Sequence, residues 1–348
     1  MACPFKIIAV QDTFVDAPLV DFPVLVRLVN TDLMRARADG ADLFFALDQH
    51  GQQPLDTQVE SWNQPTGTLV AWVRLPAVQD AAPTVFYLRY GDGRTTGHRN
   101  AAGVWQADFR AVFHMDSGGG AATQLDSSGR GNHATPDGAS CQPDQQANGL
   151  VAGALTFGAA TCDRLVAPDH ASLDLSSELT ISAWVRPNTN GVPASEVVMS
   201  KRVRVQEQAN YQVGFSSTHN MYFMWGGAPG NYPSIASNPA ATVTNGAWTH
   251  VVWTVQGNQL ALRTYLNGVR INATDQNISN SGNPTGSQLA LTPNNNPLFV
   301  GGMDQETDEV FHGDLDEVRL AGTSRSAAWI RAEYENQRPG SAFLVVGQ

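Results

Sequence analysis

The chain has 348 residues and a formal net charge of -11 at pH 7, with 32 glycines, 19 prolines and only 15% charged residues. This charge opposes binding to nucleic acid, and two lysines, Lys6 and Lys201, provide no basic cluster for anionic lipid. No run approaches the roughly 18 apolar residues that a membrane span requires, so we expect no direct membrane insertion. The length predicts two domains, and the glycines and prolines favour short strands joined by turns.

The first 105 residues are expected to form a small β-sandwich domain. Side chains in residues 84–90 alternate with a period of two and are large on both faces of a strand: Tyr87 lies on one face, and Phe86 and Leu88 lie on the other. A two-turn helix is predicted over residues 31–38, ending at Gly40. Other strands are predicted at residues 22–28, 42–47, 57–62 and 69–75.

The second domain is predicted over residues 106–340. Strands recur between turns rich in glycine, asparagine and proline, which is typical of a sandwich or jelly roll. A short helix is expected at residues 326–334, where Trp329, Ile330 and Tyr334 can hold it against a sheet. The strands are predicted at residues 109–116, 179–185, 211–215, 221–225, 248–255, 260–266, 297–300 and 315–320.

The three cysteines, Cys3, Cys141 and Cys162, lack the spacing of a zinc site. Cys141 and Cys162 flank a turn-rich segment. They either form a disulfide in an oxidising compartment or are two small buried apolar residues.

Residues 109–337 contain the motifs FHMD (113–116), DSSGRGN (126–132), GALTFG (153–158), LTISAWV (179–185), WTHVV (248–252), YLNG (265–268) and FHGDLDEVRL (311–320). With these motifs the region resembles the laminin G-like, concanavalin A-like jelly roll of bacterial surface proteins. Residues 20–108 contain the motifs FPVLV (22–26), GADLFF (40–45), VESW (59–62), AWV (71–73) and YLRYG (87–91). This region resembles a bacterial domain of unknown function, DUF2341, that often precedes such a jelly roll, although its aromatic opening is missing before residue 20.

The resemblance implies an all-β fold: a small N-terminal β-sandwich followed by an antiparallel concanavalin A-like jelly roll with a short C-terminal helix. It also implies a structural Ca²⁺ site with Asp316 as a ligand. The first and last strands of such a jelly roll lie close together, so Asp116 is expected near Asp316, with Asp126 nearby and Asp163 as a weaker candidate. Asp126 can instead cap a turn, and Asp116 and Asp316 can be solvated or paired with arginine.

A ligand-binding face is predicted around residues 221–232. Sugar sites combine an aromatic surface with planar polar groups, and Trp225, Tyr232, Tyr222 and Arg202 provide both. Strand alternation places Phe223 and Trp225 on one face and Tyr222 and Met224 on the other, so one pair belongs to the core. Each of three residues also has a purely structural alternative: Trp225 can be a core residue, Tyr232 a loop anchor and Arg202 a solubilising charge.

No catalytic residues are predicted. The nearest match to a glycosidase carboxylate set is Glu306 with Asp308, in a loop rich in glycine and aspartate where the third acid is missing. We therefore predict a non-catalytic binding or adhesion protein that recognises a glycan or a cell-surface protein. The alternatives are a structural extracytoplasmic module of a TolQ/ExbB-like envelope complex and a polysaccharide-active hydrolase. The expected location is secreted, periplasmic or at the cell surface, with the chain excised from a longer precursor.

Overall fold

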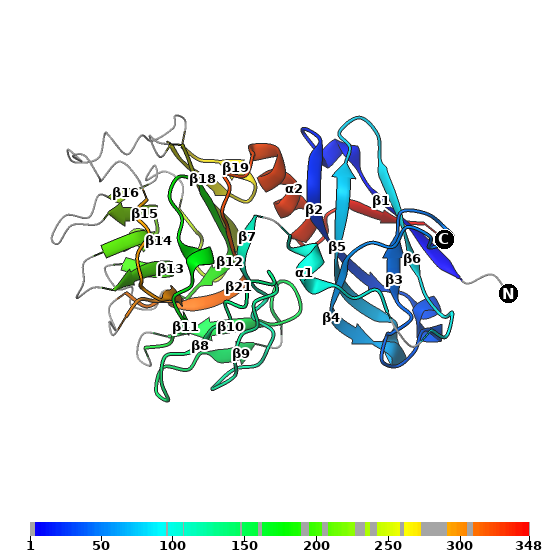
Figure 1. Ribbon diagram of the computed structural model, residues 1–348, viewed down its shortest axis with the longest axis horizontal. Helices are drawn as coiled ribbons and strands as arrows, with labels where there is room; N and C mark the ends of the chain where they lie inside the picture. The colour runs from blue at the N-terminus through cyan, green and yellow to red at the C-terminus, as the bar shows by residue number, and fades with distance from the viewer. Residues whose placement is uncertain are drawn as a thin grey trace. The chain divides into compact units, whose positions relative to one another are not determined.

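The computed structural model of the protein divides into two compact units (Figure 1). The first comprises Met1–Ala107 with Ala328–Gln348, and the second comprises Asp108–Ala327. The domain limits predicted at residues 105 and 340 stay predictions. The structure describes residues 4–94, 97–106, 108–146, 148–158, 162–188, 195–203, 208–226, 234–236, 242–257, 261–272, 291–304 and 309–347.

The first unit has two antiparallel sheets, with strand orders β22-β1-β6-β3 and β2-β5-β4. The two sheets meet through side chains such as Phe22 and Phe343, whose ring centroids lie 6.4 Å apart. The strands are β1 (Phe5–Val10), β2 (Leu19–Val29), β3 (Phe44–Ala46), β4 (Thr57–Asn63), β5 (Thr68–Val78), β6 (Thr84–Arg89) and β22 (Leu344–Val346).

Helical segments complete the first unit. The helix predicted at residues 31–38 is a shorter 3-10 turn, Thr31–Arg35, capped by the Asn30 side chain. The helix α1 (Ala101–Val104) is followed by Trp105, which packs on Trp72 with a centroid distance of 5.1 Å. The C-terminal helix α2 (Ala327–Gln337) places Trp329 against Phe22 of β2, at 4.8 Å.

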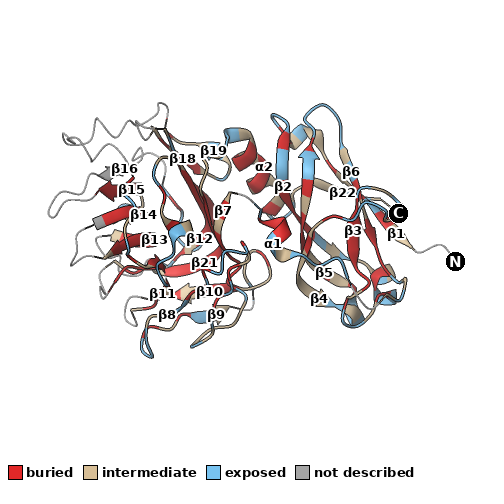
Figure 2. Cartoon of the chain, in the orientation of Figure 1, coloured by how far each residue is buried: buried red, intermediate tan, exposed pale blue. Residues whose placement is uncertain are grey.

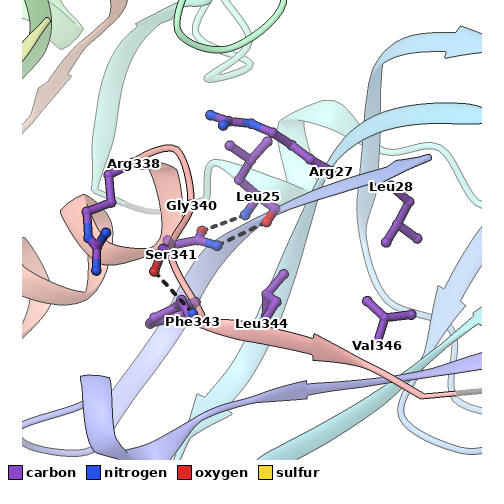
Figure 3. Close-up of a pocket in the computed structure, with 10 residues that line it drawn as sticks. Leu25, Arg27, Leu28, Arg338, Gly340, Ser341, Phe343, Leu344 and Val346 are labelled. Atoms are coloured by element: carbon purple, nitrogen blue, oxygen red, sulfur yellow. Dashed lines mark hydrogen bonds between the residues drawn. The ribbon is translucent and has the colours of Figure 1, made fainter.

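The edge strand β2 is protected by a side chain of α2. The strand contains Pro23, which is tolerated because an edge strand has neighbours on one side only. Asn336 accepts a hydrogen bond from Leu25 N (2.7 Å) and donates one to Leu25 O (3.0 Å), as an adjacent strand would. A cavity of about 190 Å³ lies beside this contact, lined by apolar side chains such as Leu28 and Phe343 and by polar ones such as Arg27 and Arg338 (Figure 3).

The second unit is the predicted jelly roll. One sheet has the order β19-β18-β17-β12-β21-β10-β9, with β7 also paired to β21, and the other has the order β16-β15-β14-β13-β20-β11-β8. The strands are β7 (Phe109–Phe113), β8 (Thr135–Pro136), β9 (Asp144–Gln146), β10 (Ala154–Phe157), β11 (Leu165–Ala167), β12 (Leu179–Pro187), β13 (Ser195–Val203), β14 (Gln208–Ser216), β15 (Met221–Gly226), β16 (Ser234–Ala236), β17 (Thr249–Gln256), β18 (Ala261–Leu266), β19 (Val269–Arg270), β20 (Leu298–Val300) and β21 (Gly313–Ala321).

The core of the jelly roll lies between its two sheets and forms one cluster (Figure 2). Along β12 every second residue points inward, namely Ile181, Ala183 and Val185. Residues from the facing sheet, including Val213 and Phe223, complete the cluster. This alternation leaves the opposite face of each sheet for polar side chains.

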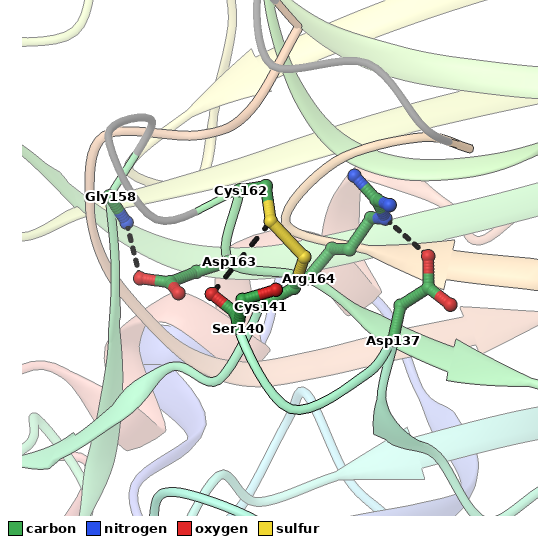
Figure 4. The surroundings of a disulfide bond; sticks show 7 residues. All are labelled: Asp137, Ser140, Cys141, Gly158, Cys162, Asp163 and Arg164. Atoms are coloured by element: carbon green, nitrogen blue, oxygen red, sulfur yellow. Dashed lines mark hydrogen bonds and ion pairs between the residues drawn. A yellow bond between two sulfur atoms is a disulfide. The ribbon is translucent and has the colours of Figure 1, made fainter.

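Cys141 and Cys162 form a disulfide, one of the two alternatives left open by the sequence (Figure 4). The adjacent Asp163 accepts a hydrogen bond from Gly158 N at 3.0 Å, and Arg164 pairs with Asp137 at 2.7 Å. The bridge therefore lies within a polar cluster that joins the loops before β9 and β11. In the described part of the chain, no helix is long and apolar enough to cross a membrane.

Candidate functional site

Polar side chains from three adjacent strands, β13, β14 and β15, gather on the outer face of the sheet that these strands share. In β14, Tyr211, Val213 and Phe215 point into the core, so the intervening Gln212 points outward. In β15 the inward side chains are Met221, Phe223 and Trp225, which leaves Tyr222 on the outer face.

Gln212 is the centre of this group. Its Oε1 accepts hydrogen bonds from Ser200 Oγ (3.1 Å) and Arg202 (3.4 Å). Its Nε2 donates to the Tyr222 hydroxyl (3.0 Å) and to Glu309 Oε2 (3.5 Å). We call Ser200, Arg202, Gln212, Tyr222 and Glu309 the outer-face network.

The network combines charged and neutral groups at low exposure. Arg202, Gln212 and Tyr222 are buried, whereas the Glu309 side chain keeps 20% of its surface accessible. Glu309 lies 3.9 Å from the Arg202 guanidinium. Burial raises the pKa of Tyr222, so its hydroxyl stays protonated and can both donate and accept. The network thus contains a guanidinium, a carboxylate, an amide and a phenol.

Two of the four predicted ligand residues, Tyr222 and Arg202, belong to this network. Trp225 instead lies in the core, fully buried, with its ring stacked on Phe223 at 5.8 Å. This burial supports the structural alternative for Trp225. Tyr232 lies outside the described residues. Sequence reasoning missed Gln212 and Glu309, although the alternation from Tyr211 to Phe215 would have placed Gln212 outward.

Asp316, the leading calcium candidate, is a fully buried residue of β21. Its Oδ2 accepts a hydrogen bond from Val151 N at 2.8 Å. Its Oδ1 is buried, and no described group donates a hydrogen bond to it. Burial, together with the nearby Glu317 carboxylate, raises the pKa of Asp316 well above its ordinary value. An oxygen of this kind fits a cation ligand.

Asp116 follows β7, which pairs with β21 as the first and last strands of the jelly roll. A Cβ atom at Gly153 would lie 3.2 Å from Asp116 Cα, and one at Gly149 would lie 2.9 Å from Asp316 Oδ2. Asp116 and Asp316 therefore lie beside the same turn, residues 149–153.

The other two metal candidates lie in local structure. The Asp126 carboxylate accepts hydrogen bonds from Val112 N (3.0 Å), Ser128 N (2.9 Å), Ser128 Oγ (2.8 Å) and Asn132 N (2.9 Å). These contacts are those of a turn cap, the alternative that the sequence left open. Asp163 lies beside the disulfide and binds Gly158 N. The assignment of Asp126 and Asp163 as calcium ligands stays a prediction, and these contacts do not support it.

Two other acids of β21, Glu317 and Asp314, form ion pairs. Glu317 contacts His114 Nδ1 at 2.9 Å and also pairs with Arg319. His114 and Arg319 lower the pKa of Glu317 despite its burial. Asp314 pairs with Arg186 at 2.6 Å. Both carboxylates are thus paired with arginine, which indicates a role in stabilising the fold.

The comparisons with known proteins concern both parts of the chain. Residues 39–125 match the family model "Domain of unknown function (DUF2341)", and residues 159–331 match "Concanavalin A-like lectin/glucanases superfamily". No curated protein matches the chain significantly.

Solved structures that the chain is similar to include toxin domains and an arabinanase domain. The binding domain of Paraclostridial Mosquitocidal Protein 1 is 14% identical, with a TM-score of 0.49 over 66% of this chain and 52% of that one. Domain 4 of AbnA, a GH43 extracellular arabinanase from Geobacillus stearothermophilus, solved with arabinotriose, is 16% identical, with a TM-score of 0.46 over 65% of this chain and 98% of that one. The botulinum neurotoxin serotype D ligand binding domain, solved with N-acetylneuraminic acid, is 14% identical, with a TM-score of 0.47 over 68% of this chain and 53% of that one.

The chain spans about half the length of the toxin domains that it matches. The two family models match in the order that the motifs predicted. The chain carries a DUF2341 domain followed by a domain of the concanavalin A-like lectin/glucanase superfamily.

Proposed function

We propose that this chain is a non-catalytic extracellular binding or adhesion protein whose jelly roll recognises a glycan or a cell-surface partner. The observation that carries this proposal is the outer-face network. It places the Arg202 guanidinium, the Gln212 amide and the Tyr222 phenol within one set of hydrogen bonds on a sheet face. Rigid planar polar groups of this kind fix the orientation of sugar hydroxyls.

The hydrogen bonds also pre-orient the groups that a ligand would contact. Because Arg202 can only donate to Gln212 Oε1 and the Glu309 carboxylate can only accept from Nε2, the amide has one favoured orientation. Glu309 is the most accessible member and supplies a carboxylate acceptor. Groups held before binding lose less side-chain entropy when the ligand arrives.

The proposal of a non-catalytic role rests on where the acids lie. Glycoside cleavage requires an acid and a second carboxylate across the scissile bond. Glu317 and Asp314 are held by cationic partners, Arg319 and Arg186 respectively. Glu306 and Asp308, the nearest sequence match to a catalytic set, lie outside the described residues.

Calcium is proposed as a structural cofactor bound at Asp316 and Asp116. The buried Asp316 Oδ1, with no hydrogen-bond donor among the described groups, supports this assignment. A cation there would compensate the buried charge and tie the turn at residues 149–153 to β21. It would stabilise the folded state because binding is linked to folding.

A secreted, periplasmic or surface location is part of the same proposal. The Cys141–Cys162 disulfide supports it because such bridges persist in oxidising compartments. The net charge of -11 is compatible with a cation-rich exterior and disfavours nucleic acid.

A glycan-array screen of the purified chain in millimolar Ca²⁺ tests the proposal. We expect reproducible binding to a defined group of glycans that an Arg202→Met variant loses. Arg164→Met is the matched control, because Arg164 and Arg202 are each 6% exposed and Arg164 pairs with Asp137 outside the network. The glycan proposal fails if no glycan is bound, or if both variants bind equally.

A second candidate is the structural module of an envelope complex. The outer face of the four-stranded sheet exposes Ile7 (36%), Val85 (41%) and Val345 (49%). Val85 and Val345 both lie opposite Ala9 in the pairing register, so they form one apolar row. An exposed row of this kind favours a protein partner. If a Val85→Glu/Val345→Glu variant still binds glycan but no longer captures a protein partner, the apolar row has a role separate from glycan binding.

A further inference from the structure

Lys201 in β13 is a fully buried lysine whose ammonium is surrounded by oxygen atoms. Its Nζ lies 2.7 Å from Asp169 Oδ1 and 3.2 Å from Asp174 Oδ1. It also lies 2.7 Å from the backbone oxygens of both Asn294 and Asn296, and 3.3 Å from Asn294 Oδ1. We call these five oxygens the Lys201 cage.

The cage holds more acceptors than an ammonium can satisfy. A lysine has three N–H donors, whereas five oxygens lie within 3.3 Å of Nζ. Asp174 Oδ1 is buried and accepts no hydrogen bond from any described group, although it lies 3.2 Å from the ammonium. An excess of oxygens around one centre is typical of metal coordination.

The composition and charge of the cage also match a divalent ion. Two carboxylates, an asparagine side chain and two backbone carbonyls are the donor types that Ca²⁺ takes. The cage contains two aspartates and one ammonium, so it keeps one negative charge. A divalent cation would neutralise the two carboxylates.

We propose that the Lys201 cage is a calcium-type cation site that the chain fills with its own ammonium. The tethered cation joins the loop after β11, which carries Asp169 and Asp174, to β13 and to the segment before β20. The neighbouring residues of β13, Ser200 and Arg202, belong to the outer-face network. This part of the jelly roll is thereby held without metal, and removal of the ammonium opens a latent Ca²⁺ site.

The test is a Lys201→Ala variant, measured by thermal unfolding in EDTA and in millimolar Ca²⁺, and by Tb³⁺ luminescence. In EDTA the melting temperature is expected to fall by about 10 °C, because two carboxylates lose their counter-ion. Ca²⁺ is expected to restore at least half of this loss, beyond any shift of the wild-type chain. That comparison separates the cage from the Asp316 site.

Two further variants make the test specific. Adding Asp174→Asn to Lys201→Ala should abolish the extra Ca²⁺ response and the extra Tb³⁺ signal. Lys6→Ala removes the other lysine, which pairs with Asp32 at 2.6 Å, and should create no metal response. A Lys201→Ala chain that folds only with Ca²⁺ supports the proposal. It is overturned if this chain folds without an added metal response, or stays unfolded with and without Ca²⁺.

Discussion

The side-chain amide of Gln212 donates a 3.0 Å hydrogen bond to the hydroxyl of Tyr222 on the adjacent strand. The same hydroxyl accepts a hydrogen bond from Ser195 at 3.1 Å. Tyr222 is therefore held by two strands, β13 and β14, and its position depends on the register of both.

Asp316→Asn is expected to remove the stabilising effect of Ca²⁺. Without Ca²⁺ the variant should unfold at the same temperature as the wild type or higher, because the substitution removes a buried charge. With saturating Ca²⁺ the wild type should gain about 2–4 kcal/mol and the variant nothing. Thermal unfolding in EDTA and in Ca²⁺ measures both effects.

Asp126→Asn is the control for this experiment. Its carboxylate accepts four hydrogen bonds from Val112, Ser128 and Asn132, so the variant should be less stable both with and without Ca²⁺. If the two variants show the same response to Ca²⁺, the assignment of the metal to Asp316 is wrong.

Glu196 is expected to make stability depend on pH. Burial raises its pKa from 4.5 to about 7, so the folded state binds a proton that the unfolded state has released between these values. Its contribution is fully present below pH 4.5 and is lost as the pH rises to about 7. The free energy of unfolding should fall by about 2–3 kcal/mol over this window.

Urea unfolding of Glu196→Gln between these pH values checks the assignment. Glutamine keeps the acceptor for His312 N, which lies 3.2 Å from Glu196 Oε1, and it does not titrate. The free energy of unfolding of the variant should depend less steeply on pH than that of the wild type. Asp316 also has a raised pKa, so in the absence of Ca²⁺ some decrease with rising pH should remain. If the variant and the wild type show the same dependence of stability on pH, Glu196 is not the group responsible.

Removal of the disulfide should destabilise the jelly roll. Cys141 and Cys162 are separated by 21 residues, and a loop of this length corresponds to about 3 kcal/mol in the chain-entropy model. A Cys141→Ser/Cys162→Ser variant should therefore melt about 6–12 °C lower than the wild type. Reduction of the wild type should lower its melting temperature similarly, and a variant as stable as the oxidised wild type would contradict the prediction.

Asn336→Asp tests the protection of the edge of β2. The aspartate keeps the acceptor for Leu25 N but loses the donor to Leu25 O, where it places two oxygens together. The first unit should lose about 1–3 kcal/mol and aggregate more readily, because the strand edge becomes available for pairing. Urea unfolding and light scattering measure these effects, and a fully soluble, equally stable variant would argue against them.

Local patterns in the sequence predicted much of the fold. The alternation in Met221–Trp225 predicted that either Phe223 or Tyr222 would point to the core, and the structure assigns the core to Phe223 and Trp225. The five strands predicted in the N-terminal region correspond to β2–β6. Periodicity is a local property, so it identifies strands without their partners.

The parts that were missed depend on long-range pairing. The short strand β22 pairs with β1, more than 300 residues away in sequence, and neither strand was predicted. In β13 the register shifts between Val197 and Met199 and again between Ser200 and Arg202, so simple alternation fails there. Lys201 meets Asn294 across 93 residues, and no local pattern indicates that contact.

The central claim, that the outer-face network binds the ligand, is tested most directly by comparing Tyr222→Phe with Tyr211→Phe. Each substitution removes one hydroxyl from neighbouring strands, but Tyr211 points into the core and donates to Leu173 O at 3.1 Å. Isothermal titration with a glycan identified on the array should show at least a tenfold loss of affinity for Tyr222→Phe, about 1.4 kcal/mol, and little change for Tyr211→Phe. Equal affinities of the two folded variants would contradict the claim.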